Sequence, residues 1–313
     1  MIKEPTSKGF QWRFAFLMGL LTVPLVFYAV YGYEIEFNSK TYTFFNKYSD
    51  QSEYNIYVWI TGGLLVGFGT RMAKGCTLGH SINGIPSLST RSFIATCTFL
   101  LTGLLMANTV LEDYSNVLEK NCFIDSKDGK PEKKYPMYGL GAFGLMMAFF
   151  VVLLVLKARH EGIHEYIETY FFGLLLGAGL MISGLCNRTT VWSFLILNKD
   201  KWNPTLGLIF FIAIVINFIT YSHILSGNPM FGSGFKLPKQ TGVDFKLLIG
   251  SGIFGLGWGL TQLDPATGII NMFLSYHIAI WFLAFVFGQC VYHYTSRYLH
   301  KKYHNCESEE SLL

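Results

Sequence analysis

Five apolar runs of membrane-spanning length constrain the fold of this 313-residue chain more than any other feature. A helix needs about 20 apolar residues to cross the hydrocarbon core of a bilayer, and a soluble domain has no interior that could hide several such runs. Only 14% of the residues are charged, against roughly 25% in an ordinary soluble domain. The runs are Phe14–Tyr33, Phe93–Leu111, Met137–Leu156, Leu206–Leu225 and Ile269–Tyr292.

Three further apolar segments are dense in glycine, and we expect them to be shorter or broken helices: Ile56–Phe68, Phe171–Ser183 and Leu247–Leu263. No stretch of soluble-domain size remains between the apolar segments. We therefore predict an all-α fold, a polytopic transmembrane helical bundle in a multi-pass integral membrane protein. One transmembrane domain would cover residues 1–313, with repeat-containing halves at about 12–156 and 169–292 and short polar tails. The loop charges fit a plasma membrane and an organelle equally.

The charge and cysteine patterns argue against several functional classes. The net charge of +4 comes from basic residues near helix ends, which is typical of membrane flanks and not of a nucleic-acid surface. The six cysteines include no C-x-x-C pair, so they indicate neither a zinc site nor a disulfide framework. No phosphate-binding loop or hydrolytic triad is apparent. We expect no metal, no cofactor and no enzymatic activity.

A Gly-x-Gly string recurs three times, and each copy ends an apolar stretch at a polar residue. The segments Gly67–Cys76, Gly177–Cys186 and Gly255–Asp264 align when the second is shifted by 110 residues and the third by 188. Repeats of this kind build many transporters. We therefore predict internal repeats, with Cys76, Cys186 and Asp264 at corresponding positions.

Polar breaks inside apolar segments predict a cavity. Lipid cannot satisfy the N–H and C=O groups of non-helical backbone, so such backbone occurs at membrane depth only where protein or water surrounds it. Short half-helices that begin at the breaks would direct their N-terminal N–H groups inward, where they attract anions. The candidate turns are Cys76–His80, Cys186–Arg188 and Asp264–Thr267.

Charged residues within the predicted spans fit the same interpretation. Four are positive and one is negative, namely Arg71, Lys74, Arg91, Arg188 and Asp264. Charges at membrane depth are costly unless they are paired or solvated, so this excess favours an anion path. An alternative stays open: the cations could extend to the membrane interface, and Asp264 could be a helix N-cap.

The first break resembles a known motif. Residues 75–80 read Gly-Cys-Thr-Leu-Gly-His, which is similar to the Gly-Cys-Thr-Ser-Gly-His signature of the YeeE/YedE sulfur-transport family. Gly173–Asn187 and Phe254–Leu260 resemble later parts of that family in matching order, so the resemblance covers most of residues 12–290. It implies inverted repeats whose short re-entrant helices meet near the midplane, with cysteines along the path of thiosulfate or a related anion.

Two departures from the family pattern bear on function. Asp264 stands where the family has a cysteine, and an ionised carboxylate would repel an anion. Cys186 lies where related sequences often have another polar residue, so it is either a relocated thiol or ordinary packing. The resemblance also leads us to expect that an N-terminal repeat element of the bacterial pattern is absent, which would call for a partner subunit or a homodimer.

The leading hypothesis is a transporter or channel that passes thiosulfate or a related small sulfur-containing anion along cysteine thiols. Its candidate path residues are Cys76, Cys186, Asp264, His80, Thr77, Arg71 and Arg188. An alternative is a non-transporting membrane scaffold subunit of a larger complex that retains the transporter fold. A membrane enzyme of persulfide or thiol redox chemistry is a third reading, and it would need a low-pKa thiolate with a resolving partner.

Overall fold

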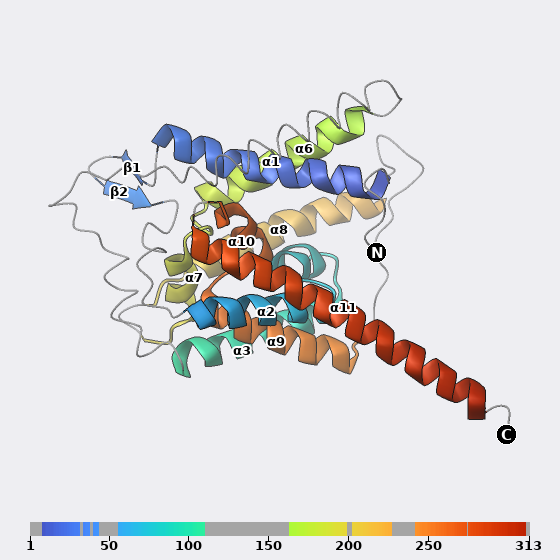
Figure 1. Ribbon diagram of the computed structural model, residues 1–313. Coiled ribbons are helices and arrows are strands. Elements are labelled where there is room, and N and C mark those ends of the chain that lie inside the picture. The colour runs from blue at the N-terminus through green and yellow to red at the C-terminus, as the bar shows by residue number, and fades with distance from the viewer. Residues whose placement is uncertain are drawn as a thin grey trace. The chain divides into compact units, whose positions relative to one another are not determined.

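The computed structural model describes residues 8–31, 34–37, 40–43, 56–109, 163–198, 202–226, 242–273 and 275–310 (Figure 1). The chain divides into two compact units that interleave along the sequence. The described part of the first unit holds α1 (Lys8–Tyr31), the antiparallel hairpin of β1 (Glu34–Phe37) and β2 (Lys40–Thr43), α6 (Ile163–Ile182) and the stretch Ala266–Ile280. The expected single transmembrane domain over 1–313 stays a prediction.

The order long helix, short helix, long helix occurs three times along the described chain. The three sets are α2 (Ile56–Ala73), η1 (Leu78–Gly84) and α3 (Thr90–Thr109); α6, α7 (Arg188–Leu195) and α8 (Thr205–Ser226); and α9 (Phe245–Thr261), α10 (Pro265–Asn271) and α11 (Tyr276–Glu310). The second unit contains α2, η1, α3, α8, α9, most of α7 and α11 from Trp281 onward. The short helices have 7, 8 and 7 residues, and a seven-residue helix is only about 10 Å long.

A left-handed residue follows the first long helix of each set. Lys74 (φ 62°), Gly184 (φ 73°) and Gln262 (φ 56°) come just after α2, α6 and α9. Gly184 lies 110 residues after Lys74, and Gln262 lies 188 residues after it. These separations equal the two offsets that align the glycine strings.

Four helices among the described residues are long and apolar enough to cross a membrane. They are Ile56–Ala73, Thr90–Thr109, Thr205–His223 and Tyr276–Leu299. Two shorter apolar helices cover Trp12–Phe27 and Tyr166–Ile182. The helical, multi-span architecture expected from the apolar runs is confirmed, with the β1–β2 hairpin as an addition.

The structure decides two points of helix continuity. The glycine-dense segments were expected to be shorter or broken helices; internal breaks are wrong, because α2, α6 and α9 run through them and the breaks follow their last residues, whereas Tyr166–Ile182 is one of the shorter apolar helices. The run Ile269–Tyr292 is not one helix, since α10 ends at Asn271 and α11 begins at Tyr276. The Asn271 amide there donates to the carbonyls of Thr267 (2.9 Å) and Cys186 (3.0 Å), so a polar side chain ends the helix within an apolar run. The run Met137–Leu156 lies outside the described residues.

Glycines bring the helices of each unit close together. In the second unit α2 and α9 pack side by side, and α9 also packs along α3 (Figure 1). A Cβ added to Gly257 of α9 would lie 2.8 Å from the backbone nitrogen of Val66 and 2.9 Å from the carbonyl oxygen of Gly62. In the first unit, Gly19 of α1 and Gly173 of α6 allow the same close approach. Small residues at such contacts are the usual way in which membrane helices pack tightly.

The contact at Gly257 gives a test of this packing. Gly257→Ala should lower the free energy of unfolding by about 1–3 kcal/mol, because the methyl group would meet backbone atoms that cannot move aside. Gly252→Ala on the same helix is the matched control, since its Cβ would have a nearest neighbour at 3.8 Å and alanine favours helix by up to about 1 kcal/mol. Thermal unfolding in detergent measures both variants, and equal midpoints would contradict the packing argument.

Candidate functional site

The chain turns sharply after α2, at the first of the predicted polar breaks. The N–H of Gly75 donates to the carbonyl of Thr70 (3.1 Å), which with left-handed Lys74 is the hydrogen bond of a Schellman helix end. Cys76 and Thr77 follow, and the chain then enters η1, a π-helix. Segments of π-helix occur often at functional sites.

Neighbouring helices hold η1 in place. The hydroxyls of Ser81 and Thr96 on α3 lie 3.2 Å apart within hydrogen-bond reach. From α8, the Asn217 amide donates to the carbonyl of Ile82 (3.1 Å), and the Tyr221 hydroxyl donates to the Asn83 side chain (2.6 Å). The position of the first break is therefore fixed by side-chain bonds from two long helices.

Two predicted site residues from distant parts of the sequence meet beside Cys76. The Thr77 hydroxyl donates to the Asp264 carboxylate (2.6 Å), and both side chains are buried. Asp264 directly precedes α10, whose first residue, Pro265, has no N–H that a first helical turn would leave unpaired. The structure thus joins the first and third breaks through a single short hydrogen bond.

A cavity of about 780 Å³ lies beside this turn. We call it the basic cavity. Its wall combines the end of α2, Cys76, the beginning of α9, Pro265 and one face of α11. Four cationic side chains belong to this wall: Arg71, Lys74, Lys246 and Arg297.

The positive charge of the basic cavity is not balanced within the described residues. None of its four lysine and arginine side chains forms an ion pair with a described carboxylate. Among the described residues, the one carboxylate in its wall is Asp244, and Arg91 already pairs with it at 3.0 Å. The cavity therefore favours anions.

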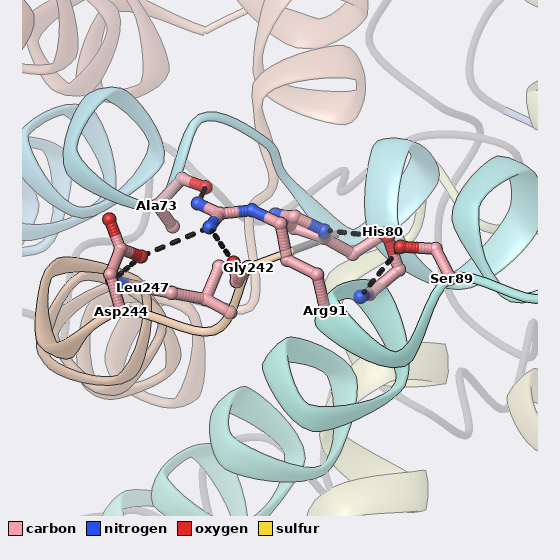
Figure 2. A network of polar contacts seen from close by, with 8 residues as sticks. Ala73, His80, Ser89, Arg91, Gly242, Asp244 and Leu247 are labelled. Atoms are coloured by element: carbon pink, nitrogen blue, oxygen red, sulfur yellow. Dashed lines mark hydrogen bonds and ion pairs between the residues drawn. The ribbon is translucent and has the colours of Figure 1, made fainter. Parts of the chain in front are cut away.

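Arg91 connects three segments around this site (Figure 2). Its guanidinium donates to the carbonyls of Gly242 (2.7 Å) and Ala73 (3.3 Å) and to the Asp244 carboxylate, while the N–H of Leu247 donates to the same carboxylate (3.1 Å). Desolvation raises the pKa of Asp244, but the bond and charge of Arg91 outweigh it and hold that pKa below the ordinary 3.8. Arg91 thus donates hydrogen bonds both to the carbonyl of the last residue of α2 and to the carboxylate that caps the N-terminus of α9.

A second, smaller cavity of about 270 Å³ lies beside η1, the helix that follows the Cys76 turn. We call it the small cavity, and it is lined by Lys74, Gly79, His80, Asn83, Gly84, Ser87, Ser89, Arg91, Ser92 and Tyr221. The His80 imidazole is buried, with Nδ1 at 3.3 Å from the Ser92 hydroxyl (Figure 2). Burial lowers the pKa of His80, the Ala73 carbonyl opposes this and the charge of Arg91 lowers it further, so the ring is neutral at neutral pH.

Cys76 lies in the wall of the basic cavity, in the turn that follows the span Ile56–Ala73. Two effects raise the pKa of the Cys76 thiol to about 11: desolvation by burial, which is the larger, and the negative charge of Asp264. The thiol therefore keeps its proton at neutral pH and can donate an S–H hydrogen bond to an anion. A low-pKa thiolate, which the thiol-redox hypothesis requires, is not what these surroundings favour.

The remaining predicted residues are distributed over both cavities and both units. Arg71 lines the basic cavity and His80 the small cavity, whereas Cys186 and Arg188 are buried residues of the first unit. The backbone carbonyl of Cys186 accepts the Asn271 amide, which ties the second break to α10 within that unit. Among the described residues, no group of three or more metal-ligating side chains could hold a metal ion.

Sequence reasoning missed the contribution of α11. Five of its residues line the basic cavity at positions i, i+3, i+4, i+7 and i+8: Gln289, Tyr292, His293, Ser296 and Arg297. This spacing places the five residues on one face of the helix, and all of them except Tyr292 have polar or charged side chains. The available signal was Gln289 near the end of the apolar run, followed at helical spacing by His293, Ser296 and Arg297 beyond it.

The raised pKa of Cys76 predicts slow alkylation. In a variant that retains only Cys76, the rate with iodoacetamide should rise with pH toward an inflection near 11, where an ordinary thiol would inflect near 9. Asp264→Asn should move this inflection to lower pH without reaching 9, because desolvation remains. Mass spectrometry after brief exposure to the reagent measures the rate, and an inflection near 9 in the parent would refute the assignment.

Arg91→Lys tests the three-segment connection. A lysine cannot reproduce the planar fork that reaches Gly242, Ala73 and Asp244, so we expect a loss of about 2–3 kcal/mol of stability from unmet hydrogen bonds. Lys246→Arg is the comparison, because Lys246 has no described hydrogen bond to lose. If both variants unfold at the temperature of the parent, Arg91 is not the residue that holds these segments.

Comparisons with known proteins place the chain in a family. Residues 43–105 match the family described as Sulphur transport, and residues 164–303 match a family of unknown function, DUF6691. A protein of Xylella fastidiosa strain Temecula1, named "Probable transporter", is 32% identical over 123 residues, which cover 39% of this chain and 82% of the relative. The counterpart in strain 9a5c is also 32% identical and is covered to 84%.

A further relative with the same printed name, from strain 9a5c, is 56% identical over 48 residues, or 15% of this chain and 36% of the relative. No solved structure matches the chain. The first two relatives are covered over most of their length, and the Sulphur transport match includes the Cys76 turn. Together with the four candidate spans, these matches show that the chain belongs to the sulphur transport family and is a multi-pass membrane protein.

Proposed function

We propose that this chain transports thiosulfate or a related small sulfur-containing anion, which enters through the basic cavity and contacts Cys76. The observation that carries the proposal is the unbalanced charge of that cavity: four cations share a wall with a neutral thiol, and the one carboxylate there is already paired. The family match and the printed name of the Xylella relatives support transport as the activity.

The chemistry of the wall suits passage of an anion. Long-range attraction by Arg71, Lys246 and Arg297 would concentrate anions in the cavity. The Cys76 S–H is a weak donor, so it would hold an anion briefly without trapping it. Asp264 is bonded to Thr77, and it is Pro265 that lines the cavity, so we assign Asp264 the role of positioning the Cys76 turn.

We also propose that the three breaks are repeats of one re-entrant element. The left-handed residues at 74, 184 and 262 follow the same offsets as the glycine strings, and a short helix of 7 or 8 residues comes after each. A helix of this length cannot span the bilayer, but it can end at a site inside it. Cys186 and Arg188 would then occupy in the second repeat the positions that Cys76 and Leu78 occupy in the first.

The test is uptake of ³⁵S-labelled thiosulfate into proteoliposomes that contain the purified chain. Saturable uptake should fall by at least about tenfold in Cys76→Ala, since a hydrogen bond to a charged group contributes about 1.5–3 kcal/mol. Cys97→Ala is the matched control, because Cys97 is an exposed residue of α3 that lines neither cavity. It should transport at the rate of the parent.

Asp264→Cys separates two outcomes. If the parent transports and this variant loses uptake together with stability, Asp264 positions the turn as proposed. If the parent shows no uptake and the variant gains it, the fold is retained for a different substrate. Absence of uptake in all the proteins would overturn the proposal in favour of the scaffold hypothesis.

A further inference from the structure

Lys74 has an unusual backbone conformation for its residue type. It takes a left-handed φ of 62° as the first residue after α2, where glycine is the residue that fits without strain. The corresponding position after α6 is Gly184. A bulky residue at positive φ is uncommon and costs backbone energy, so we expect the Lys74 side chain to have a role that offsets this cost.

Gln262, which occupies the position after α9, has such an explanation and Lys74 does not. The buried Gln262 amide donates to the carbonyl of Gly259 (2.7 Å) and so completes the end of its own helix. Lys74 is exposed, and within the described part of the chain its ammonium group makes no hydrogen bond or ion pair. Capping of α2 does not require it, since Arg91 donates to the Ala73 carbonyl.

The location of Lys74 between two cavities indicates a role for its side chain. It lines the basic cavity and also the small cavity, and it is the one residue common to the two walls as described. The other cation of the small cavity, Arg91, is committed to Asp244, Gly242 and Ala73. Lys74 is therefore the cation that remains available to an anion there.

The small cavity also offers a neutral donor for an oxyanion. The Ser89 hydroxyl oxygen accepts the N–H of Ser92 (3.3 Å), which leaves its own proton to donate (Figure 2). No carboxylate lines this cavity among the described residues. A hydroxyl donor beside an ammonium group and away from carboxylates matches the needs of a small tetrahedral oxyanion.

We propose that the small cavity is a second binding site for a sulfur oxyanion, and that the Lys74 ammonium binds the anion in both cavities and so links them. This inference rests on the proposed function for the identity of the anion. It adds a second binding position, on the His80 side of the turn, to the position beside Cys76.

Two measurements on the full chain test the link. Equilibrium binding of ³⁵S-thiosulfate should show two sites in the parent, and Lys74→Gly should weaken both by about tenfold, the expected loss of one charged hydrogen bond. Lys74→Arg should bind nearly as the parent does. The thermal midpoint of Lys74→Gly should equal or exceed that of the parent, because glycine relieves the left-handed backbone.

Leu88→Gly is the matched control for this substitution. Leu88 is exposed at φ 57° and lines neither cavity, so its replacement relieves similar strain without removing a ligand. Gly79→Phe tests the small cavity itself, since Gly79 lines it and a Cβ there meets no atom within 4 Å. We expect this variant to lose one site and to keep the other.

The outcomes distinguish the two proposals. Parental affinity in Lys74→Gly, or an equal loss in Leu88→Gly, would overturn the role of Lys74. A single site in the parent, unchanged by Gly79→Phe, would overturn the second site while leaving transport through the basic cavity intact. If the parent neither binds nor takes up thiosulfate, the proposed function fails, and the inference fails with it.

Discussion

A helix that ends inside an apolar protein leaves backbone carbonyls without partners, and the end of α2 is where this requirement shapes the structure. Arg91 meets it by donating to the Ala73 carbonyl, while its other donors reach Gly242 and Asp244. The same side chain thereby pairs with the one carboxylate in the wall of the basic cavity. The charge of the cavity depends on this arrangement, because a free Asp244 would compete with an anion for the surrounding cations.

The turn itself depends on close helix packing. Glycines such as Gly257 let α2 and α9 approach at backbone distance, and the chain that leaves α9 reaches Asp264, which accepts the Thr77 hydroxyl. Cys76 is consequently held between a desolvating wall and a negative charge, which keeps its thiol protonated. A protonated thiol suits hydrogen bonding to an anion better than it suits nucleophilic or redox chemistry.

The repeat hypothesis rests on the left-handed residues and the short helices after them, and the family matches do not test it. The family matches cover the first break and, through a separate family, residues 164–303 that contain the other two. The left-handed residues follow the same spacing as the glycine strings, although spacing alone did not indicate which residue would take that conformation. In the first and third copies the left-handed residue is not glycine but Lys74 and Gln262. Of these two, Gln262 is the one whose side chain completes the end of its helix.

The sequence by itself determined the membrane class and the positions of the breaks, and it singled out Cys76 as a candidate site residue, because hydropathy and the Gly-Cys-Thr motif are local properties of the chain. Pairing of Thr77 with Asp264 across 187 residues was decided by tertiary structure, as was the commitment of Arg91 to Asp244. The contribution of α11 likewise became apparent only from the distant residues that share its cavity wall. Charge balance in a cavity depends on which distant residues share its wall, and no local pattern of residues specifies that.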